Sequence, residues 1–127
     1  MATVELNEQN LEKTVTENDI VIIDFWAPWC GPCKSFGPTF EAASEKHDDI
    51  VFAKVNTEEE QGIAAHFQIR SIPTLMVFRE QIIIFAEAGA MPASGFDELI
   101  ERVKTLDMDK VREDIAAAEK EAAAQQS

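Results

Sequence analysis

The two cysteines of the chain, Cys30 and Cys33, stand two residues apart in the run WAPWCGPCKS (26–35). Such a pair suits a metal site, a structural disulfide or a redox-active dithiol. Zinc needs four ligands, and the two histidines, His47 and His66, fall in different expected helices without ligand spacing to the pair. A disulfide that closes so short a loop stabilises a fold by roughly 2 kcal/mol, before strain is subtracted. We therefore predict a redox pair and no metal site.

The residues around the pair favour this redox role. Cys30 follows the apolar run IVIIDFW and precedes an expected helix, where free backbone N–H groups and the helix dipole stabilise a thiolate. Cys33 lies one helical turn later and can attack a mixed disulfide formed on Cys30. Gly31 permits close backbone approach, and Pro32 fits a first helical turn because no N–H is needed there. We expect Cys30 to be the accessible thiol and Cys33 the shielded one.

Two charged residues stand inside runs that read as buried strands. Asp24 interrupts VIIDFW, and burial of its carboxyl should raise its pKa, so that it can exchange protons near neutral pH. It would then lie beneath Cys33 and take the proton of that thiol. Lys54 in VFAKVN is the matching cation, and the two could form a buried pair. The alternative is that both side chains reach solvent at strand ends.

The elements that would position these residues alternate along the chain. Period-2 and continuous apolar runs predict strands over Thr3–Leu6, Ile20–Trp26, Val51–Asn56, Thr74–Arg79 and Ile82–Glu87. Helical spacing predicts helices over Asn7–Asn18, Cys33–His47, Glu59–Phe67 and Ser94–Leu106. Asn7 and Ser94 are the expected N-terminal caps, and Pro38 is expected to kink the second helix. This order indicates an α/β fold with a mixed central sheet flanked by helices.

The chain divides into a main domain over residues 1–106 and an Ala/Glu-rich segment over 107–127. The segment is rich in helix formers and predicts a helix of about 25 Å with a thin apolar face. That face includes Val111 and Ile115. The helix is expected either to pack weakly or extend into solvent, or to dock on another protein or a second copy through these two residues.

Composition limits the partners and the location of the chain. It has 127 residues and a net charge of −13, which argues against nucleic acid and anionic membranes because phosphate binding needs clustered Lys and Arg. The N-terminal residues show no signal-peptide pattern, and the apolar runs are far shorter than a membrane helix. We expect a cytoplasmic protein, most simply a monomer.

Several of these runs together resemble the thioredoxin family. The matching stretches are DFWAPWCGPCKSFGP (24–38), AKVNT (53–57), IRSIPTLMVF (69–78) and GA (89–90). The resemblance covers about residues 3–105 and implies about five strands with helices on both faces of the sheet. It implies that Cys30 attacks and Cys33 resolves, that Asp24 and Lys54 are the buried acid and lysine, and that Pro73 is a cis-proline. It also implies a substrate groove formed by Trp29, Gly31, Pro32, Ile72, Pro73, Gly89 and Ala90.

The resemblance further implies a protein-disulfide reductase. Gly31-Pro32 between the cysteines is similar to the reducing members, whereas oxidants and isomerases tend to carry histidine there. The substrates would be disulfide-containing proteins. A flavin-dependent thioredoxin reductase would return electrons from NADPH, so no cofactor need bind this chain.

The chain departs from the family pattern in three places. Arg79-Glu80-Gln81 replaces the usual Asn-Gly type of hairpin turn, and the following isoleucines leave an apolar edge. Met91-Pro92-Ala93 lengthens the loop beside the expected groove, and the segment beyond Leu106 lies outside the resemblance. Other readings therefore stay open: a reductant dedicated to one partner, a weak isomerase, or a scaffold that recruits a protein through the groove or the C-terminal helix.

Overall fold

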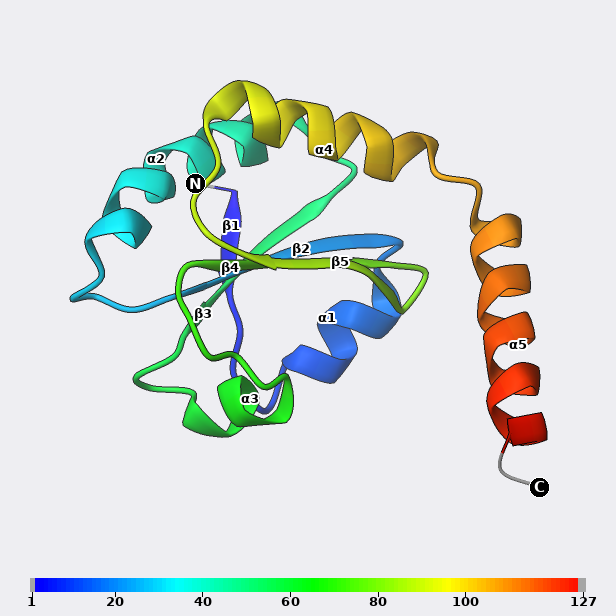
Figure 1. Ribbon diagram of the computed structural model, residues 1–127. Helices are drawn as coiled ribbons and strands as arrows, with labels where there is room; N and C mark the ends of the chain where they lie inside the picture. The colour runs from blue at the N-terminus through cyan, green and yellow to red at the C-terminus, as the bar shows by residue number, and fades with distance from the viewer. Residues whose placement is uncertain (1, 126–127) are drawn as a thin grey trace.

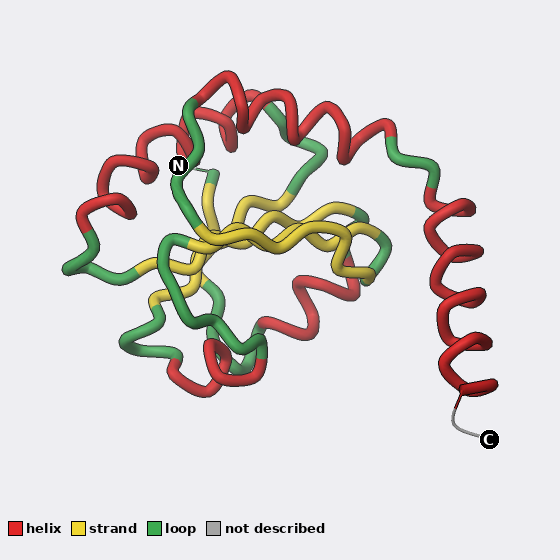
Figure 2. The backbone as a smooth tube through the Cα atoms, in the orientation of Figure 1, coloured by secondary structure: helices red, strands yellow, loops and turns green. Residues whose placement is uncertain are grey.

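The computed structural model describes residues 2–125, which form a central sheet between two layers of helices and a separate C-terminal helix (Figures 1 and 2). The strands are β1 (Thr3–Glu5), β2 (Ile20–Trp26), β3 (Val51–Asn56), β4 (Thr74–Arg79) and β5 (Ile82–Ala88). The helices are α1 (Leu11–Glu17), α2 (Gly31–Lys46), α3 (Gln61–His66), α4 (Ala93–Thr105) and α5 (Met108–Gln125). Helices α2 and α4 cover one face of the sheet and α1 and α3 the other, so the expected mixed α/β architecture is confirmed.

The sheet has the order β1-β3-β2-β4-β5, with β2 at its centre. Strand β2 runs parallel to β3 and antiparallel to β4. The first residues of β2, from Ile20 to Phe25, are all buried, because helices cover both faces of the strand. The carboxyl end of β2 therefore leads from the buried centre of the sheet to the loop that carries Cys30.

Two apolar cores lie on the two faces of the sheet. Beneath α2 and α4, four phenylalanines form one cluster, in which the Phe36–Phe96 and Phe40–Phe52 pairs are edge to face with ring centroids 5.4 Å apart. On the other face, alternate β2 residues such as Ile23 and Phe25 pack against α1 and α3. The alternation along β2 places Asp24 on the α2 side, with Ile20 and Ile22.

Two expected helix caps are wrong. The Asn7 side chain accepts hydrogen bonds from the backbone N–H groups of Gln9 (2.9 Å) and Asn10 (3.0 Å), so it closes a turn and α1 begins later, at Leu11. Ser94 lies inside α4, which begins at Ala93 after Pro92, and its side chain makes no capping bond. In both places the pattern of residue types was correct for the presence of a helix but not for the residue at which the helix begins.

The β4–β5 turn is a two-residue loop with an unusual sequence. Glu80 (φ 51°) and Gln81 (φ 70°) both adopt left-handed backbone conformations, as a type I′ turn requires. Neither residue type favours this region, and each costs on the order of 1 kcal/mol there. The Glu80 N–H donates to the Asp19 carbonyl at 2.7 Å, and Arg112 of α5 contacts the Glu80 carboxylate, so the turn is held from two sides.

Helix α5 lies beside the β4–β5 hairpin, away from the rest of the molecule (Figure 1). Met108 at its start is buried, whereas Ile115 is exposed on its apolar face. A groove of about 410 Å³ separates this face from the edge strand β5, lined mainly by Ile82–Ile84, Leu106, Val111, Ile115 and Ala118. The helix is therefore attached at one end and loosely packed along its length.

We predict that Gln81→Asn stabilises the protein by roughly 0.5–1 kcal/mol, because asparagine tolerates positive φ without the extra unfolded-state entropy of glycine. Urea unfolding of the oxidised protein, followed by circular dichroism, measures the change. An unchanged or lower unfolding midpoint would show that the turn carries no such strain.

Candidate active site

The cysteines lie where β2 passes into α2. Cys30 is the N-cap of α2 and Cys33 is in its first turn, with Pro32 between them where a missing N–H is harmless. The two residues form a disulfide with their Cα atoms 5.2 Å apart. The helix therefore begins at Gly31, two residues before the expected start, because the nucleophile itself caps it.

Backbone groups surround the sulfur of Cys30. The Cys33 N–H points at Cys30 Sγ, with 3.2 Å between nitrogen and sulfur. An N–H group at a helix N-terminus carries partial positive charge, so this contact favours the thiolate of Cys30 once the disulfide is reduced. The carbonyl oxygen of Ile72 lies 3.8 Å from the same sulfur.

Three loops meet at the disulfide. The Ile72–Pro73 peptide bond is cis, as expected, and Ile72 packs against the cysteines. The Gly89 N–H donates to the Pro73 carbonyl at 2.8 Å, which joins the loop after β5 to the cis-proline loop. Trp29, Gly31, Pro32, Gly89 and Ala90 are exposed, Ile72 is half-buried, and Pro73 is buried. The structure thus brings the residues of the expected groove to the same end of the sheet.

The expected difference in accessibility between the cysteines is not present in this oxidised structure. Cys30 and Cys33 are each 4% exposed. The disulfide turns both sulfurs toward each other, and Ala27, Trp26 and Ile72 pack around them. In the oxidised pair, the two sulfurs therefore differ in the backbone contact that Cys30 receives and not in their exposure.

Asp24 is fully buried in the central strand, so it does not reach solvent. Neither of its carboxyl oxygens has a hydrogen-bond partner among the described residues. Burial raises the pKa of this carboxyl from the ordinary 3.8 to about 6, and the nearby Lys54 ammonium opposes the rise. Asp24 thus changes protonation state close to neutral pH.

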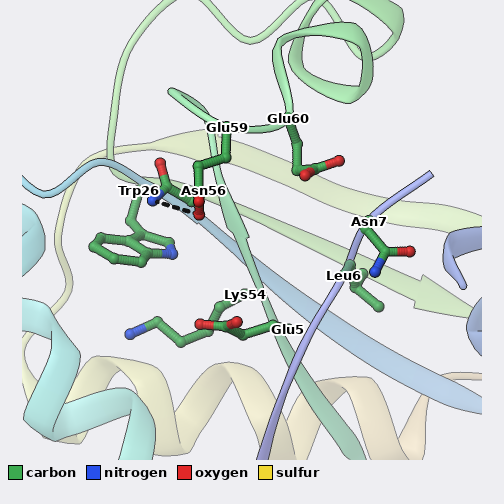
Figure 3. A pocket seen from close by; sticks show the side chains of 8 residues that line it. All are labelled: Glu5, Leu6, Asn7, Trp26, Lys54, Asn56, Glu59 and Glu60. Atoms are coloured by element: carbon green, nitrogen blue, oxygen red, sulfur yellow. Dashed lines mark hydrogen bonds between the residues drawn. The ribbon is translucent and has the colours of Figure 1, made fainter. Parts of the chain in front are cut away.

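Lys54 on β3 is in register with Asp24 on β2, but the two side chains do not form the buried pair suggested by the sequence. Within the described part of the chain no ion pair joins the two residues. The half-buried Lys54 places its Nζ 4.8 Å from the centre of the Trp26 ring. Its side chain runs along a polar pocket of about 230 Å³ that Glu5, Asn56, Glu59 and Glu60 also line (Figure 3). Lys54 therefore acts on Asp24 through its charge and not through a direct contact.

One contact at the site involves a residue that the sequence analysis missed. The indole N–H of Trp29 donates to the carboxylate of Glu58, in the loop after β3. The two residues are 29 positions apart in the chain, so no local sequence pattern could predict their hydrogen bond. Among the described residues, no group of three or more His, Cys, Asp and Glu side chains is arranged to hold a metal. No described helix is long and apolar enough to cross a membrane.

Comparison with known proteins gives relatives over most of the chain. The family model named Thioredoxin matches residues 2–105. A putative thioredoxin 2 from Streptomyces coelicolor is 51% identical over 121 residues, which is 95% of this chain and 90% of the relative. A thioredoxin from the alga Porphyra purpurea is 36% identical over 104 residues, 80% of this chain and 97% of the relative. The Streptomyces match is long enough to extend into the C-terminal segment.

Solved structures give the same result for the fold. A mutant thioredoxin from Halobacterium salinarum superposes with a TM-score of 0.75 at 30% identity, covering 83% of this chain and 93% of the other. A thioredoxin from Plasmodium falciparum gives 0.74 at 31% identity, covering 79% and 98%. With the fold, the cysteine pair and the sequence match in agreement, the chain belongs to the thioredoxin family and is a thiol–disulfide oxidoreductase.

Proposed function

We propose that the protein reduces disulfides of other proteins, with Cys30 as the attacking residue and Cys33 as the resolving one. The observation that supports this assignment is the Cys33 N–H directed at Cys30 Sγ at the start of α2. Of the two sulfurs, that of Cys30 receives this contact at the positive end of the helix dipole. This contact stabilises the Cys30 thiolate in the reduced protein, and the thiolate is the nucleophilic form of a cysteine.

The first step forms a mixed disulfide. The Cys30 thiolate attacks one sulfur of the substrate, the new bond joins Cys30 Sγ to that sulfur, and the substrate S–S bond breaks. The leaving thiolate of the substrate takes a proton from solvent. Three exposed or half-buried elements, the loops around Trp29, Ile72 and Gly89, would hold the substrate chain beside the sulfur. Backbone groups of Ile72 are suited to pair with an extended peptide.

The second step releases the substrate. Cys33 loses its proton, its thiolate attacks Cys30 Sγ, and the mixed disulfide breaks to give a second substrate thiolate and the Cys30–Cys33 disulfide. Asp24 lies on the α2 side of the sheet, and its pKa of about 6 suits it to accept the Cys33 proton. Lys54 favours the ionised form of this base. Two electrons pass from the dithiol to the substrate.

The proposal also includes the re-reduction of the Cys30–Cys33 disulfide and the location of the protein. A flavin-dependent thioredoxin reductase would return two electrons from NADPH, so this chain would work without a bound cofactor, in electron transport and cell redox homeostasis. We propose a monomer that works in the cytoplasm, with residues 1–106 as the catalytic domain. The charge of −13 argues against nucleic acid and anionic membranes as partners.

A second function is supported by one observation. The groove between α5 and β5 exposes Ile83, Leu106 and Ile115, each at least 37% exposed. Helix α5 lies on the opposite side of the molecule from the start of α2 (Figure 1). Residues 107–127 would then recruit a protein while the domain carries out the exchange. Removal of this segment, with activity on a protein disulfide as the readout, separates recruitment from catalysis.

We predict that Cys33→Ser accumulates a covalent complex with a disulfide-bearing protein such as insulin, because no thiol remains to break the mixed disulfide. Cys30→Ser should give neither reduction nor complex. Non-reducing electrophoresis and mass spectrometry of the reduced variants identify the products. A complex formed by Cys30→Ser instead would reverse the assignment of the two cysteines.

We predict that Asp24→Asn becomes more stable relative to the unsubstituted protein as pH rises. In the folded protein the pKa of Asp24 is raised from 3.8 to about 6. The stability that the protonated carboxyl contributes is therefore fully present below pH 3.8 and is lost as the pH rises through 6. Between acid and alkaline conditions, the unfolding free energy of Asp24→Asn relative to the unsubstituted protein should rise by roughly 3 kcal/mol. Urea unfolding of both oxidised proteins near pH 3.5 and near pH 8 measures it, and a pH-independent difference would contradict the raised pKa.

A further inference from the structure

We propose that Glu5 is a positioning residue for Asp24, the proton acceptor of the second step: it holds the Lys54 ammonium away from Asp24 and so restrains the ionisation of that carboxyl. The inference rests on the proposed role of Asp24 and extends it to β1, an edge strand of the sheet. It connects this edge strand with the proton transfer at Cys33.

Glu5, Lys54 and Asp24 form a row across three neighbouring strands. Glu5 on β1 is in register with Lys54 on β3, and Lys54 is in register with Asp24 on β2. The Leu6 N–H donates to the Lys54 carbonyl at 2.9 Å, which fixes this register at the end of β1. Because residues in register on neighbouring parallel strands point to the same face about 4.8 Å apart, Lys54 lies between two residues that carry carboxyl groups.

The Lys54 side chain occupies the space beside Glu5 and makes no pair with Asp24. Lys54 is half-buried and lines the same pocket as Glu5 (Figure 3), with its Nζ 4.8 Å from the centre of the Trp26 ring. Asp24 is fully buried, and neither of its carboxyl oxygens has a partner among the described residues. A lysine side chain is long and flexible, so its ammonium settles where water and opposite charge are within reach.

The other acids near Lys54 belong to other segments. Glu59 and Glu60, between β3 and α3, line the same pocket. On α2, Glu41 accepts a hydrogen bond from the Thr3 hydroxyl at 2.7 Å. The core residues that α2 and α4 place over this face of the sheet are apolar, mainly phenylalanines. None of these acids is in register with Lys54, so the acid on β1 is the one that strand pairing itself places beside the ammonium.

The direction of the effect follows from the signs of the charges. The Lys54 ammonium favours the ionised form of Asp24 and opposes the effect of burial on the pKa of that carboxyl. The exposed Glu5 carboxylate weakens this influence, because it attracts the ammonium and also repels a second negative charge on the same face. Removal of the Glu5 charge should therefore let Asp24 ionise at lower pH.

Two matched substitutions test this effect. Glu5→Gln removes the charge and keeps the length of the side chain. Glu17→Gln is the control, since it removes one exposed acid from α1, on the opposite face of the sheet (Figure 1). The pKa of Asp24 is measured in each oxidised protein from the pH dependence of its carboxyl-carbon NMR signal, which is assigned with Asp24→Asn. In the reduced proteins, stopped-flow reaction with dithiobis(nitrobenzoate) gives two releases of thionitrobenzoate, the second of which is caused by Cys33.

We expect Glu5→Gln to lower the Asp24 pKa by about 0.5, the effect of one partly screened charge two strands away. The second release should then be about twofold faster near pH 5.5, where more Asp24 is ionised, and unchanged near pH 8. Glu17→Gln should change neither measurement. In Lys54→Met, the Glu5→Gln substitution should lower the Asp24 pKa by less than half as much, because the cation that Glu5 restrains is gone.

Three results would overturn the inference: an unchanged or higher Asp24 pKa in Glu5→Gln, an equal fall in Glu17→Gln, or an equal fall in the Lys54→Met background. A lower pKa without a faster second release near pH 5.5 would also overturn it, provided that Asp24→Asn slows that release. If Asp24→Asn leaves the second release unchanged at every pH, the proposed base role of Asp24 fails. The NMR measurements then still decide whether Glu5 acts on Asp24 through Lys54.

Discussion

The contact between the Cys33 N–H and Cys30 Sγ depends on the junction of β2 and α2, and the rest of the site is arranged around that junction. An interior strand, buried on both faces, is joined to a helix by a short loop, and Cys30, the last residue of that loop, is the helix N-cap, so a free N–H group of the first helical turn meets its sulfur. Placing a cysteine at this N-cap converts an ordinary capping position into a nucleophile. The phenylalanine-rich core packs β2 against α2, and the second core covers the other face of β2, so the two elements that make the contact are held together by apolar packing.

The strand that leads to this junction also carries a buried carboxyl, that of Asp24. A fully buried carboxyl without a hydrogen-bond partner destabilises a fold when it is ionised, yet Asp24 lies in the central strand. Its burial is what brings its pKa close to neutral, and Lys54 limits the rise without neutralising the group by direct contact. A domain of this size can include one such group because its apolar cores are large on both faces of the sheet.

Local patterns in the sequence were sufficient for the strands and for the chemistry of the cysteines. Strands Ile20–Trp26, Val51–Asn56 and Thr74–Arg79 have the expected bounds, because continuous apolar runs with β-branched residues leave few alternatives. The caps at Asn7 and Ser94 were wrong since a turn or a preceding proline competes with a helix for the same residue types.

Two contacts at the site join segments that are distant in the sequence, so no local pattern could predict them. Lys54 lies over the ring of Trp26, and the indole N–H of Trp29 donates to Glu58. The turn at Glu80-Gln81 keeps the usual backbone geometry with unusual residues, and α5 contacts it.

The most direct test of the account is the pH dependence of alkylation of the reduced protein, with the modified cysteine identified by mass spectrometry. If the N-terminus of α2 stabilises a thiolate, iodoacetamide modifies Cys30 first, with an apparent pKa below the ordinary 8.5 of a cysteine thiol. Cys33 should react later. An apparent pKa of 8.5 or above for Cys30, or faster modification of Cys33, would contradict the claim that this helix start activates Cys30.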